Sequence, residues 1–310
     1  MRKESAFSVT LQTMSRRRRT RSSRSRENHR PKQFSPPVQF LRRRWIEAKL
    51  FLQAIRKAPP TVQVGIYLSI LVIVSMGVNW GYHAYYKPTE LFFPVERALH
   101  KSPQETWSEY GALFDVHSTD IVAPELLAAL AQAEGSGNPV ARTYWRLRLT
   151  SRNPLEWYQP ASSAVGMFQI TNGTFQEGKR YCIHNHQVVE DGPWHDLTSC
   201  WFNSLYSRVI PGHAMEMTAA LLDRQVTRLV GNRAATLQQK QDLAAIIHLC
   251  GAGFGRTYVS RNFQLAVHQR CGDHDVRTYL RKIQTLTRQF AFLKTRTQEP
   301  EELRAEPRPG

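Results

Sequence analysis

The chain has 310 residues and a formal net charge of +17, and that charge is unevenly distributed. Residues 1–60 contain 17 Lys and Arg against 3 Asp and Glu, whereas the rest of the chain contains 25 basic and 22 acidic side chains. A general nucleic-acid-binding domain needs a basic face on its folded part. The nearly neutral composition after residue 60 argues against this class of protein.

The first 60 residues form a basic tail. The run SRRRRTRSSRSR (15–26) has almost no large apolar side chains. It cannot bury enough surface to offset its ordering entropy, so we expect disorder there. Segment 40–57 interleaves apolar residues with Arg and Lys, which is typical of a helix on an anionic membrane surface; a plain solvated cytoplasmic tail is the alternative. The interleaved apolar residues are Phe40, Trp45, Leu50 and Ile55.

Residues 61–86 form a run without Asp, Glu, Lys or Arg. About 20 such residues in a helix cross the hydrocarbon core of a membrane, so the run predicts one transmembrane helix. The Arg-rich side stays in the cytoplasm by the positive-inside rule, which exports the chain after Lys87. A cleaved signal peptide is the alternative, but the run is too long and begins too far along the chain, so we interpret it as a signal anchor. Aromatic residues cluster at its far end, as in an interfacial belt: Trp80, Tyr82, Tyr85 and Tyr86.

All four cysteines lie on the exported side. An even number of cysteines in an oxidising compartment indicates disulfides. Proximity in the sequence favours the pairs Cys182–Cys200 and Cys250–Cys271, although four cysteines allow three pairings. Each bridge would close a loop of about 20 residues, worth about 3 kcal/mol in the chain-entropy treatment.

Between a stalk with a short helix at 87–120 and a disordered polar tail at 296–310, residues 121–295 have the length of one domain with its own core. Apolar residues recur there at helical spacing, and strand-like alternation is scarce. We therefore predict a mainly α-helical fold. The predicted helices cover residues 124–134, 213–230, 236–250 and 275–293.

The first predicted helix ends in the stretch AQAEGSGNP (131–139). Leu127, Leu130 and Glu134 lie three or four residues apart, so they share the face that points to the core. Burial there would disfavour the ionised carboxylate and raise the pKa of Glu134, as a general acid near neutral pH requires. The alternative is a Glu at a frayed helix end, tilted into solvent.

Four sequence motifs follow one another along the exported part: EGSGNP (134–139), GMFQITNGT (166–174), LCGAGFGR (249–256) and VRTYLRKI (276–283). In this order they resemble the motifs of the lytic transglycosylases, bacterial enzymes that cut peptidoglycan and share the goose-type lysozyme fold. The corresponding family patterns are a Glu followed by Ser and Asn-Pro, GLMQ(L/I)xPxT, AYNAGPGR and TRxYVxKV. Four motifs in the right order make a far more specific signal than one alone, and the resemblance covers residues 120–290.

The resemblance implies a lysozyme-like helical domain with a single catalytic carboxylate, here Glu134. In this family the Glu protonates the glycosidic oxygen between N-acetylmuramic acid and N-acetylglucosamine, and the substrate's own N-acetyl group stabilises the cationic centre. The deprotonated Glu then takes the proton of the C6 hydroxyl, which closes a 1,6-anhydro ring without a protein nucleophile. The partner would be the glycan strands of peptidoglycan, with no cofactor and no metal. The catalytic domain would lie in the periplasm, anchored in the bacterial inner membrane by a single-pass helix with a cytoplasmic N-terminus.

The resemblance also implies supporting roles for other motif residues. Met167, Phe168 and Gln169 would line the sugar groove, and Tyr279 would hydrogen-bond near the Glu. From the residues alone, Gln169 could instead be a polar surface residue and Tyr279 a core aromatic of an amphipathic helix.

The chain departs from the family pattern at several positions. Gly135 replaces the usual Ser and removes a hydroxyl that could contact substrate or orient the Glu; Ser136 is the candidate substitute. Cys250 and Gly251 replace the Tyr and Asn of the third motif, which removes an amide expected to contact sugar. These changes leave the predicted fold intact and put activity in question. Glu216 is a remote candidate for a second carboxylate.

Segment 181–213 is longer than the family's usual connection and is rich in Cys and His. A zinc site is one interpretation, since thiolate and imidazole are normal zinc ligands. The Cys-x-His-x-His spacing is not a standard one and export favours oxidation, so we expect a disulfide there rather than a metal. Its aromatic residues would either extend the groove by stacking on sugars or form a small core under the bridge: Trp194, Trp201, Phe202 and Tyr206.

The sequence therefore predicts a membrane-anchored lytic transglycosylase. Two related alternatives are a hydrolase that leaves a reducing end and a catalytically weak glycan-binding scaffold of an envelope complex, suggested by the altered third motif. A third alternative places the function in residues 1–60, which would tether DNA, RNA or anionic lipid to the membrane.

Overall fold

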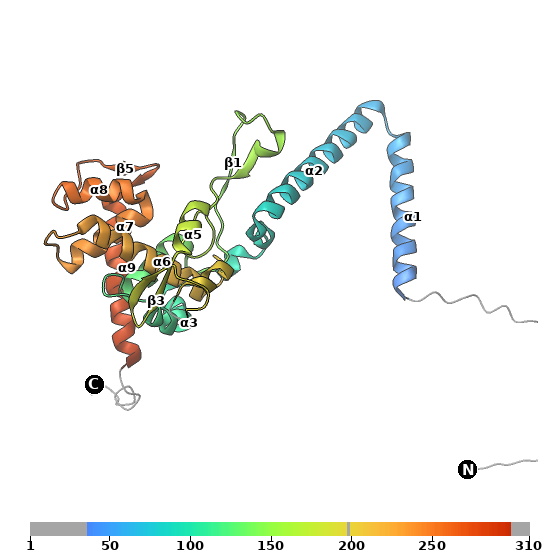
Figure 1. The fold of residues 1–310 in the computed structure, drawn as a ribbon. Helices are drawn as coiled ribbons and strands as arrows, with labels where there is room; N and C mark the ends of the chain where they lie inside the picture. Colours follow the sequence, from blue (N-terminus) through green and yellow to red (C-terminus); the bar gives the residue numbers. More distant parts are fainter. Residues whose placement is uncertain (1–35, 197–198, 299–310) are drawn as a thin grey trace, which may run out of the picture. The chain divides into compact units, whose positions relative to one another are not determined.

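The computed structural model describes residues 36–196 and 199–298 (Figure 1). The disorder expected for 15–26 and the polar tail expected beyond residue 298 lie outside the described residues. The chain divides into two compact units, Met1–Ile70 and Leu71–Gly310, which are described separately.

The first unit contains α1 (Pro36–Lys57) and the first turns of α2 (Pro60–Tyr86). α2 begins at Pro60. Proline is suited to this position because it lacks the N–H group, which in the first turn of a helix would have no intrahelical acceptor. The side-chain amide of Gln63 donates to the carbonyl of Ala58 at 2.8 Å, which satisfies one backbone group at the break between the helices. The predicted contact of α1 with a membrane surface stays a prediction.

α2 coincides with the predicted apolar run. Within the described residues it is the one helix that is long and apolar enough to cross a membrane, judged by length and composition. Side chains along its middle, such as Leu71, Val72 and Ile73, are exposed. An exposed apolar stretch of this kind is favoured in an apolar environment such as a membrane provides.

The second unit is mainly helical, as predicted. Each of the four helices predicted from periodicity is present, with ends that shift by a few residues. α9 continues through residues 296–298, so these residues are helical rather than part of a frayed tail. The helices are α3 (Pro103–Val116), α4 (Pro124–Gly135), α5 (Asn172–Gly178), α6 (Pro211–Val230), α7 (Leu237–Cys250), α8 (Ala252–Ser260) and α9 (Val276–Gln298).

α4 is the central helix of the domain and packs against both α3 and α9. Its residues 126–131, LLAALA, are all buried, so this stretch is covered on every side. A helix covered all round needs small side chains where its neighbours come closest, and the alanines supply them. The position of α4 fixes where its last turn, with Glu134, emerges from the core.

α3 is part of the same core. Trp107 of α3 stacks on Phe114 with ring centroids 6.2 Å apart and tilts against Phe290 of α9 at 5.8 Å. Ser102 and Glu105 form a capping box that satisfies backbone N–H groups at the start of the helix. The helix predicted within the stalk is therefore present over residues 103–116, but it packs into the core of the domain instead of standing apart from it.

In the described part of the chain, three antiparallel hairpins lie between the helices: β1 (Trp145–Leu147) with β2 (Tyr158–Pro160), β3 (Tyr181–His184) with β4 (Gln187–Glu190), and β5 (Arg270–Cys271) with β6 (His274–Asp275). A two-stranded hairpin is marginal alone and depends on what it packs against. β3 packs on α6, whereas the β1–β2 hairpin projects from the helical body (Figure 1). Short 3-10 turns complete the chain: η1 (Pro88–Phe92), η2 (Glu96–Leu99), η3 (Pro154–Glu156) and η4 (Trp201–Leu205).

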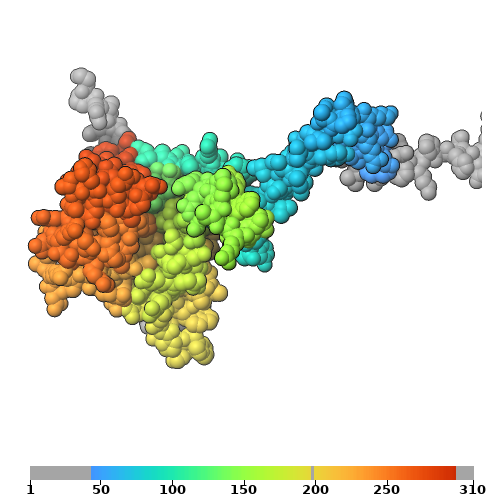
Figure 2. Space-filling model, turned by 90° about the horizontal axis from the view of Figure 1, so that it is seen from above, coloured from blue at the N-terminus to red at the C-terminus, as the bar shows by residue number. Residues whose placement is uncertain are grey.

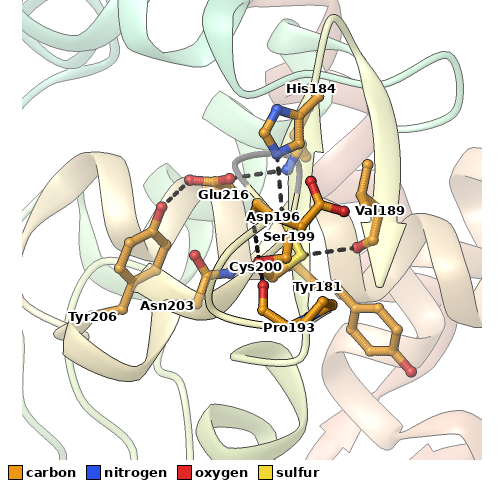
Figure 3. The surroundings of a disulfide bond; sticks show 12 residues. Tyr181, His184, Val189, Pro193, Asp196, Ser199, Cys200, Asn203, Tyr206 and Glu216 are labelled. Atoms are coloured by element: carbon orange, nitrogen blue, oxygen red, sulfur yellow. Dashed lines mark hydrogen bonds between the residues drawn. A yellow bond between two sulfur atoms is a disulfide. The ribbon is translucent and has the colours of Figure 1, made fainter. Parts of the chain in front are cut away.

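The long insertion is fastened by a disulfide between Cys182 and Cys200, in agreement with the sequence (Figure 3). The side-chain amide of Asn203 donates to the carbonyl of Tyr181 at 2.7 Å and holds the returning chain beside β3. Three of the aromatic side chains of the insertion, Trp194, Trp201 and Phe202, are exposed, so they do not form the small core that was one of the two predictions for them.

Candidate active site

Glu134 lies in the last turn of α4. Leu127, Leu130 and Ala131, which precede it on the same face, are fully buried. Glu134 itself is only half-buried, because the helix ends one residue later at Gly135. The periodic pattern therefore identified the right face of the helix and overstated the burial of the carboxylate.

The carboxylate of Glu134 accepts a hydrogen bond from the hydroxyl of Tyr279, with 2.6 Å between Oε1 and the phenol oxygen. Tyr279 stands in the first turn of α9, which the Asp275 carboxylate caps by accepting the N–H of Thr278 at 2.7 Å. Burial raises the pKa of Tyr279 well above its ordinary value of 10, and the charge of Glu134 and the hydrogen bond to it add to that shift. The phenol therefore stays protonated and acts as a donor to the carboxylate.

The turn that follows Glu134 is closed by left-handed backbone. Ser136 caps α4 with φ 50°, and Gly137 follows with φ 65°. The N–H of Gly137 donates to the carbonyl of Ala131 at 3.2 Å, as at many helix ends that terminate in this conformation. Ser136 thus has a backbone role, and contact of its hydroxyl with substrate stays a prediction.

Asn138 of the first motif is fully buried and has a structural role. Its side-chain oxygen accepts the N–H of Val140 at 2.9 Å, and its side-chain nitrogen donates to the carbonyl of Glu96 at 3.1 Å. These bonds fold the chain back after the acid and tie the turn to η2. The Asn-Pro signature therefore positions Glu134 indirectly.

Gly135 explains one departure from the family pattern. A Cβ at this position would lie 2.7 Å from the Cα of Met167 and 2.9 Å from its carbonyl oxygen. The end of α4 therefore rests directly on the backbone of the second motif, and the usual Ser would not fit without a shift. The side chains of Met167 and Phe168 are both fully buried in the core, so neither presents exposed side-chain surface to the predicted groove.

The second motif is a tight turn held by its own Gln. Gln169 has left-handed backbone with φ 48°, a conformation that costs a non-glycine residue about 1–3 kcal/mol. Its side-chain amide donates to the carbonyl of Gly166 at 2.9 Å and to that of Ala141 at 3.3 Å. These bonds offset the cost and fix the turn, which leaves the side-chain oxygen of Gln169 available to another donor.

A cavity of about 220 Å³ opens beside this turn, against α6 and the junction of α7 with α8. Phe168 and Gln169 of the second motif line it, together with Gly251 of the third. Glu134 is not among its lining residues. Its polar lining side chains are Gln169, Thr171, Thr174, Glu177, Thr218, Gln225 and His248.

His248 connects this cavity with the carboxylate and was not predicted. Burial lowers the pKa of His248 below its ordinary value of 6.5, while the charge of Glu134 and a hydrogen bond with the backbone of Phe168 act in the opposite direction. The imidazole is therefore neutral at pH 7. A single His in an apolar helix does not reveal its role in the sequence, because that role depends on which distant residues lie next to it in the fold.

Lys282 is a second residue that sequence reasoning missed. Its ammonium group donates to the carbonyl of Ala133 at 3.0 Å. The last carbonyls of a helix have no intrahelical partner, and a cation there also complements the helix dipole. α9 thus contacts the end of α4 twice, through Tyr279 and through Lys282.

Cys250 and Cys271 are separate thiols in the structure rather than the predicted disulfide. They lie side by side: burial raises the pKa of Cys250, and the hydrogen bond and the charge of Cys271 add to the shift. The thiol of Cys271 also approaches the carbonyl of Leu249 at 3.5 Å. The sequence correctly predicted that Cys250 and Cys271 are neighbours, but the disulfide predicted between them is absent from the structure.

Glu216, the remote candidate for a second carboxylate, belongs to a different cluster. It accepts hydrogen bonds from the N–H of Ile183 at 2.9 Å and from the hydroxyl of Tyr206 (Figure 3). It also lies 3.8 Å from a ring nitrogen of His117. Within the described ranges, none of its contacts reaches Glu134. Over the same residues, no three His, Cys, Asp or Glu side chains are grouped so as to hold a metal ion.

Comparison with known proteins gave no match: no protein-family model, no curated protein and no solved structure matches this chain. The resemblance to lytic transglycosylases therefore rests on the four sequence motifs.

Replacing Gly135 by Ala should destabilise the domain by about 1–3 kcal/mol, because the new Cβ overlaps the backbone of Met167 rather than a side chain that can move. The matched control is Gly173→Ala, where nothing lies within 4 Å of the added carbon. The free energy of unfolding would be measured by urea denaturation of the full chain in mild detergent, followed by tryptophan fluorescence. Equal stability of the two variants would contradict the packing described here.

Acidification from about pH 7.5 to about pH 5 should lower the free energy of unfolding, partly through His248. Its pKa in the folded state lies below 6.5, so below that pH the unfolded chain binds more protons and gains stability relative to the folded one. The variant His248→Asn should lose less stability over this range than the unchanged chain. The exposed His100→Asn serves as the control. Identical pH profiles for the unchanged chain and the His248 variant would show that the imidazole is not held neutral.

Proposed function

We propose that this protein is a lytic transglycosylase with a lysozyme-like domain, anchored in the bacterial inner membrane and facing the periplasm. It would cleave the β-1,4 bond between N-acetylmuramic acid and N-acetylglucosamine in peptidoglycan and leave a 1,6-anhydro end. α2 would be its single membrane span, with the basic tail in the cytoplasm.

The hydrogen bond between Glu134 and Tyr279 is the observation that carries this proposal. The two residues belong to the first and fourth motifs and are 145 positions apart, so their contact is unexpected unless these motifs build one site. The described residues give the second carboxylate oxygen of Glu134 no hydrogen bond, which leaves it available to a substrate oxygen.

The chemistry assigned to Glu134 is acid catalysis followed by base catalysis. The protonated carboxyl donates to the glycosidic oxygen, and the carboxylate that results is stabilised by the hydrogen bond from Tyr279. The carboxylate then accepts the proton of the C6 hydroxyl as that oxygen attacks the anomeric carbon, which regenerates the acid. Each step moves one proton through one side chain.

The surroundings of Glu134 favour this route over a two-carboxylate glycosidase. Retaining and inverting enzymes place a second carboxyl group about 5–10 Å from the first. In the described residues, the side chain that hydrogen-bonds to Glu134 is a phenol, and the acid that lines the adjoining cavity, Glu177, already accepts a hydrogen bond from Gln225. A hydrolase that activates water through the same Glu is the closest alternative, because it would need no further residue.

The cavity beside Gln169 is the candidate for one sugar subsite. Its volume is below the range of about 300–1,000 Å³ that is usual for sites enclosing a larger ligand, and its lining mixes amides and hydroxyls with apolar walls, as an N-acetylated sugar requires. Gly251 lines the cavity where the family motif has an Asn expected to contact sugar, so this contact is missing. Its loss favours the second candidate function, a glycan-binding scaffold of an envelope complex with little turnover.

Glu134→Gln should abolish cleavage of purified peptidoglycan by the full chain in mild detergent, because an amide cannot donate the proton. The control variant is the exposed Glu109→Gln. Mass spectrometry of the fragments distinguishes the proposals: 1,6-anhydro ends support a transglycosylase, and reducing ends indicate the hydrolase. Binding without cleavage by the unchanged chain would indicate the scaffold.

Tyr279→Phe should lower the rate of cleavage about 10- to 100-fold with little change in glycan binding. The phenol donates to a carboxylate, and hydrogen bonds to charged groups contribute about 1.5–3 kcal/mol. The ring is retained, so the core around α9 should keep its stability. An unchanged rate, with the domain still folded, would show that the hydrogen bond does not take part in the reaction.

A further inference from the structure

A second cavity, of about 300 Å³, lies at the end of α2 and is lined by positively charged side chains. Lys87 follows the last residue of α2, Arg146 and Arg148 come from the β1–β2 hairpin, and Arg208 comes from the insertion. No Asp or Glu lines it. Gln159 and Ser162 add an amide and a hydroxyl.

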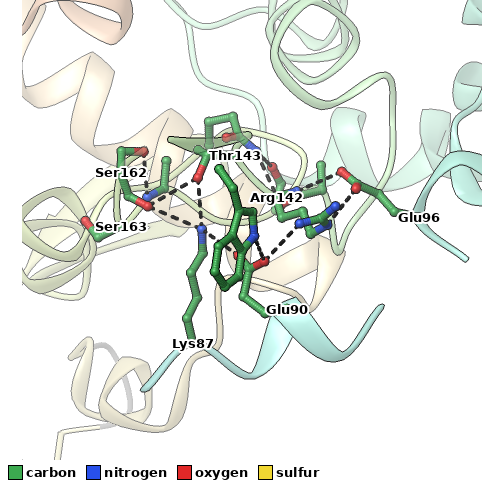
Figure 4. Close-up of polar contacts among 12 residues, drawn as sticks. Lys87, Glu90, Glu96, Arg142, Thr143, Ser162 and Ser163 are labelled. Carbon is green, nitrogen blue, oxygen red and sulfur yellow. Dashed lines mark hydrogen bonds and ion pairs between the residues drawn. The ribbon is translucent and has the colours of Figure 1, made fainter. Parts of the chain in front are cut away.

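The charges near this cavity are only partly compensated. Glu90 is fully buried and pairs with Lys87 at 3.3 Å and with Arg142 at 2.9 Å, and Glu96 pairs with Arg142 at 2.7 Å (Figure 4). Two cations and two carboxylates thus neutralise one another behind the cavity wall. Lys87 also reaches Thr143 Oγ1 at 3.3 Å, which fixes its ammonium group in the wall.

Three arginines remain without a carboxylate partner in the described part of the chain. Arg208 is held in place because its guanidinium donates to the carbonyls of Ser163 and Ile170, each at 2.9 Å. Arg146 and Arg148 are exposed. Three guanidinium groups converge on one cavity, and a planar guanidinium suits the oxygens of a phosphate.

The hairpin that carries two of these arginines has one basic and one apolar face. In the strand register Arg146 is opposite Gln159 and Leu147 is opposite Tyr158, so the basic residue and the aromatic ring point to opposite faces. Trp145 contacts Tyr158 on the apolar face, with ring centroids 5.1 Å apart. The apolar side chains left exposed around the turn are Leu147, Leu149 and Trp157.

The hairpin is fastened to the end of α2. Asn79 Nδ2 donates to the carbonyl of Leu155 at 2.7 Å, and a ring nitrogen of His83 lies 2.8 Å from the same oxygen. In Figure 2 the hairpin forms the green lobe next to the cyan residues at the end of α2. The exposed apolar side chains of the hairpin are therefore placed beside the last turns of an apolar helix.

The depth of the cavity follows from helix geometry. If the hydrocarbon core of about 30 Å begins near residue 61, it ends about 20 residues later, near Trp80. His83 and Lys87 then lie about 5–10 Å beyond it, within the headgroup layer. The cavity opens where lipid phosphates are found.

We propose that this cavity binds the phosphate group of a membrane lipid in the periplasmic leaflet, with Arg146, Arg148 and Arg208 as its ligands and the apolar side chains of the hairpin inserted beside the acyl chains. The inference rests on α2 crossing the membrane. It does not depend on glycan cleavage, because the three arginines lie outside the four motifs and Asn172 is the one motif residue that lines the cavity.

The test is lipid retention by the full chain in detergent, followed by native mass spectrometry without any glycan. Phosphatidylglycerol should bind, and diacylglycerol with the same acyl chains should not. The double variant Arg146→Gln/Arg148→Gln should bind phosphatidylglycerol about 30-fold more weakly, from about 1 kcal/mol for each basic residue at a lipid surface. The control Arg228→Gln/Arg233→Gln removes the same charge from exposed residues elsewhere.

Three results would overturn the proposal. If the two double variants bound the lipid with equal affinity, the cavity would not be the binding site. Equal retention of diacylglycerol would show that apolar contact alone holds the lipid. Binding of inorganic phosphate as tight as that of the lipid would make a soluble anion the ligand. Near-ultraviolet circular dichroism would establish that both variants are folded.

Discussion

The contact between Gly135 and the backbone of Met167 is the constraint on which the site depends. It sets the last turn of α4 directly on the second motif, so the acid at position 134 and the turn held by Gln169 share one rigid support. The buried LLAALA stretch fixes the other end of the same helix in the core. Two close contacts along one short helix therefore determine where the carboxylate stands. A larger side chain at position 135 would push the first and second motifs apart, even if it carried no charge.

Around this support, the groups that face Glu134 are kept in one protonation state. Tyr279 has a raised pKa and His248 a lowered one, and burial is the first cause in both cases. At pH 7 the phenol that donates to the carboxylate is therefore neutral, the imidazole of His248 is also neutral, and the ammonium of Lys282 is directed at the carbonyl of Ala133. Proton transfer at such a site depends on donated hydrogen bonds more than on neighbouring full charges. This arrangement suits a residue that has to give up a proton and take one back in the same cycle.

The sequence predicted those features that depend on local spacing. Helical periodicity located α4 and α9, and motif order placed Glu134 and Tyr279 in one site. It failed where the outcome depends on contacts between distant segments. Met167 stands in a motif position expected to line a groove, yet the close approach of α4 buries its side chain. Trp107 lies in a polar segment that reads as a stalk, and only the ring of Phe290 opposite shows why its helix is part of the core. The neutral His248 has no local signature, because its environment includes the backbone of Phe168, 80 positions earlier in the chain.

The polar network behind the basic cavity links the membrane end of the domain to the candidate active site. Glu90 follows α2 and pairs with Arg142, and Arg142 pairs with Glu96. The backbone carbonyl of Glu96 in turn accepts the side chain of Asn138, four residues after the acid. Because Glu90 is fully buried, separating it from its cations would leave an uncompensated charge in the protein, at a cost of about 3–5 kcal/mol. The segment that leaves α2 is therefore bound to the turn that follows Glu134, so these contacts fix the position of that carboxylate relative to the end of α2.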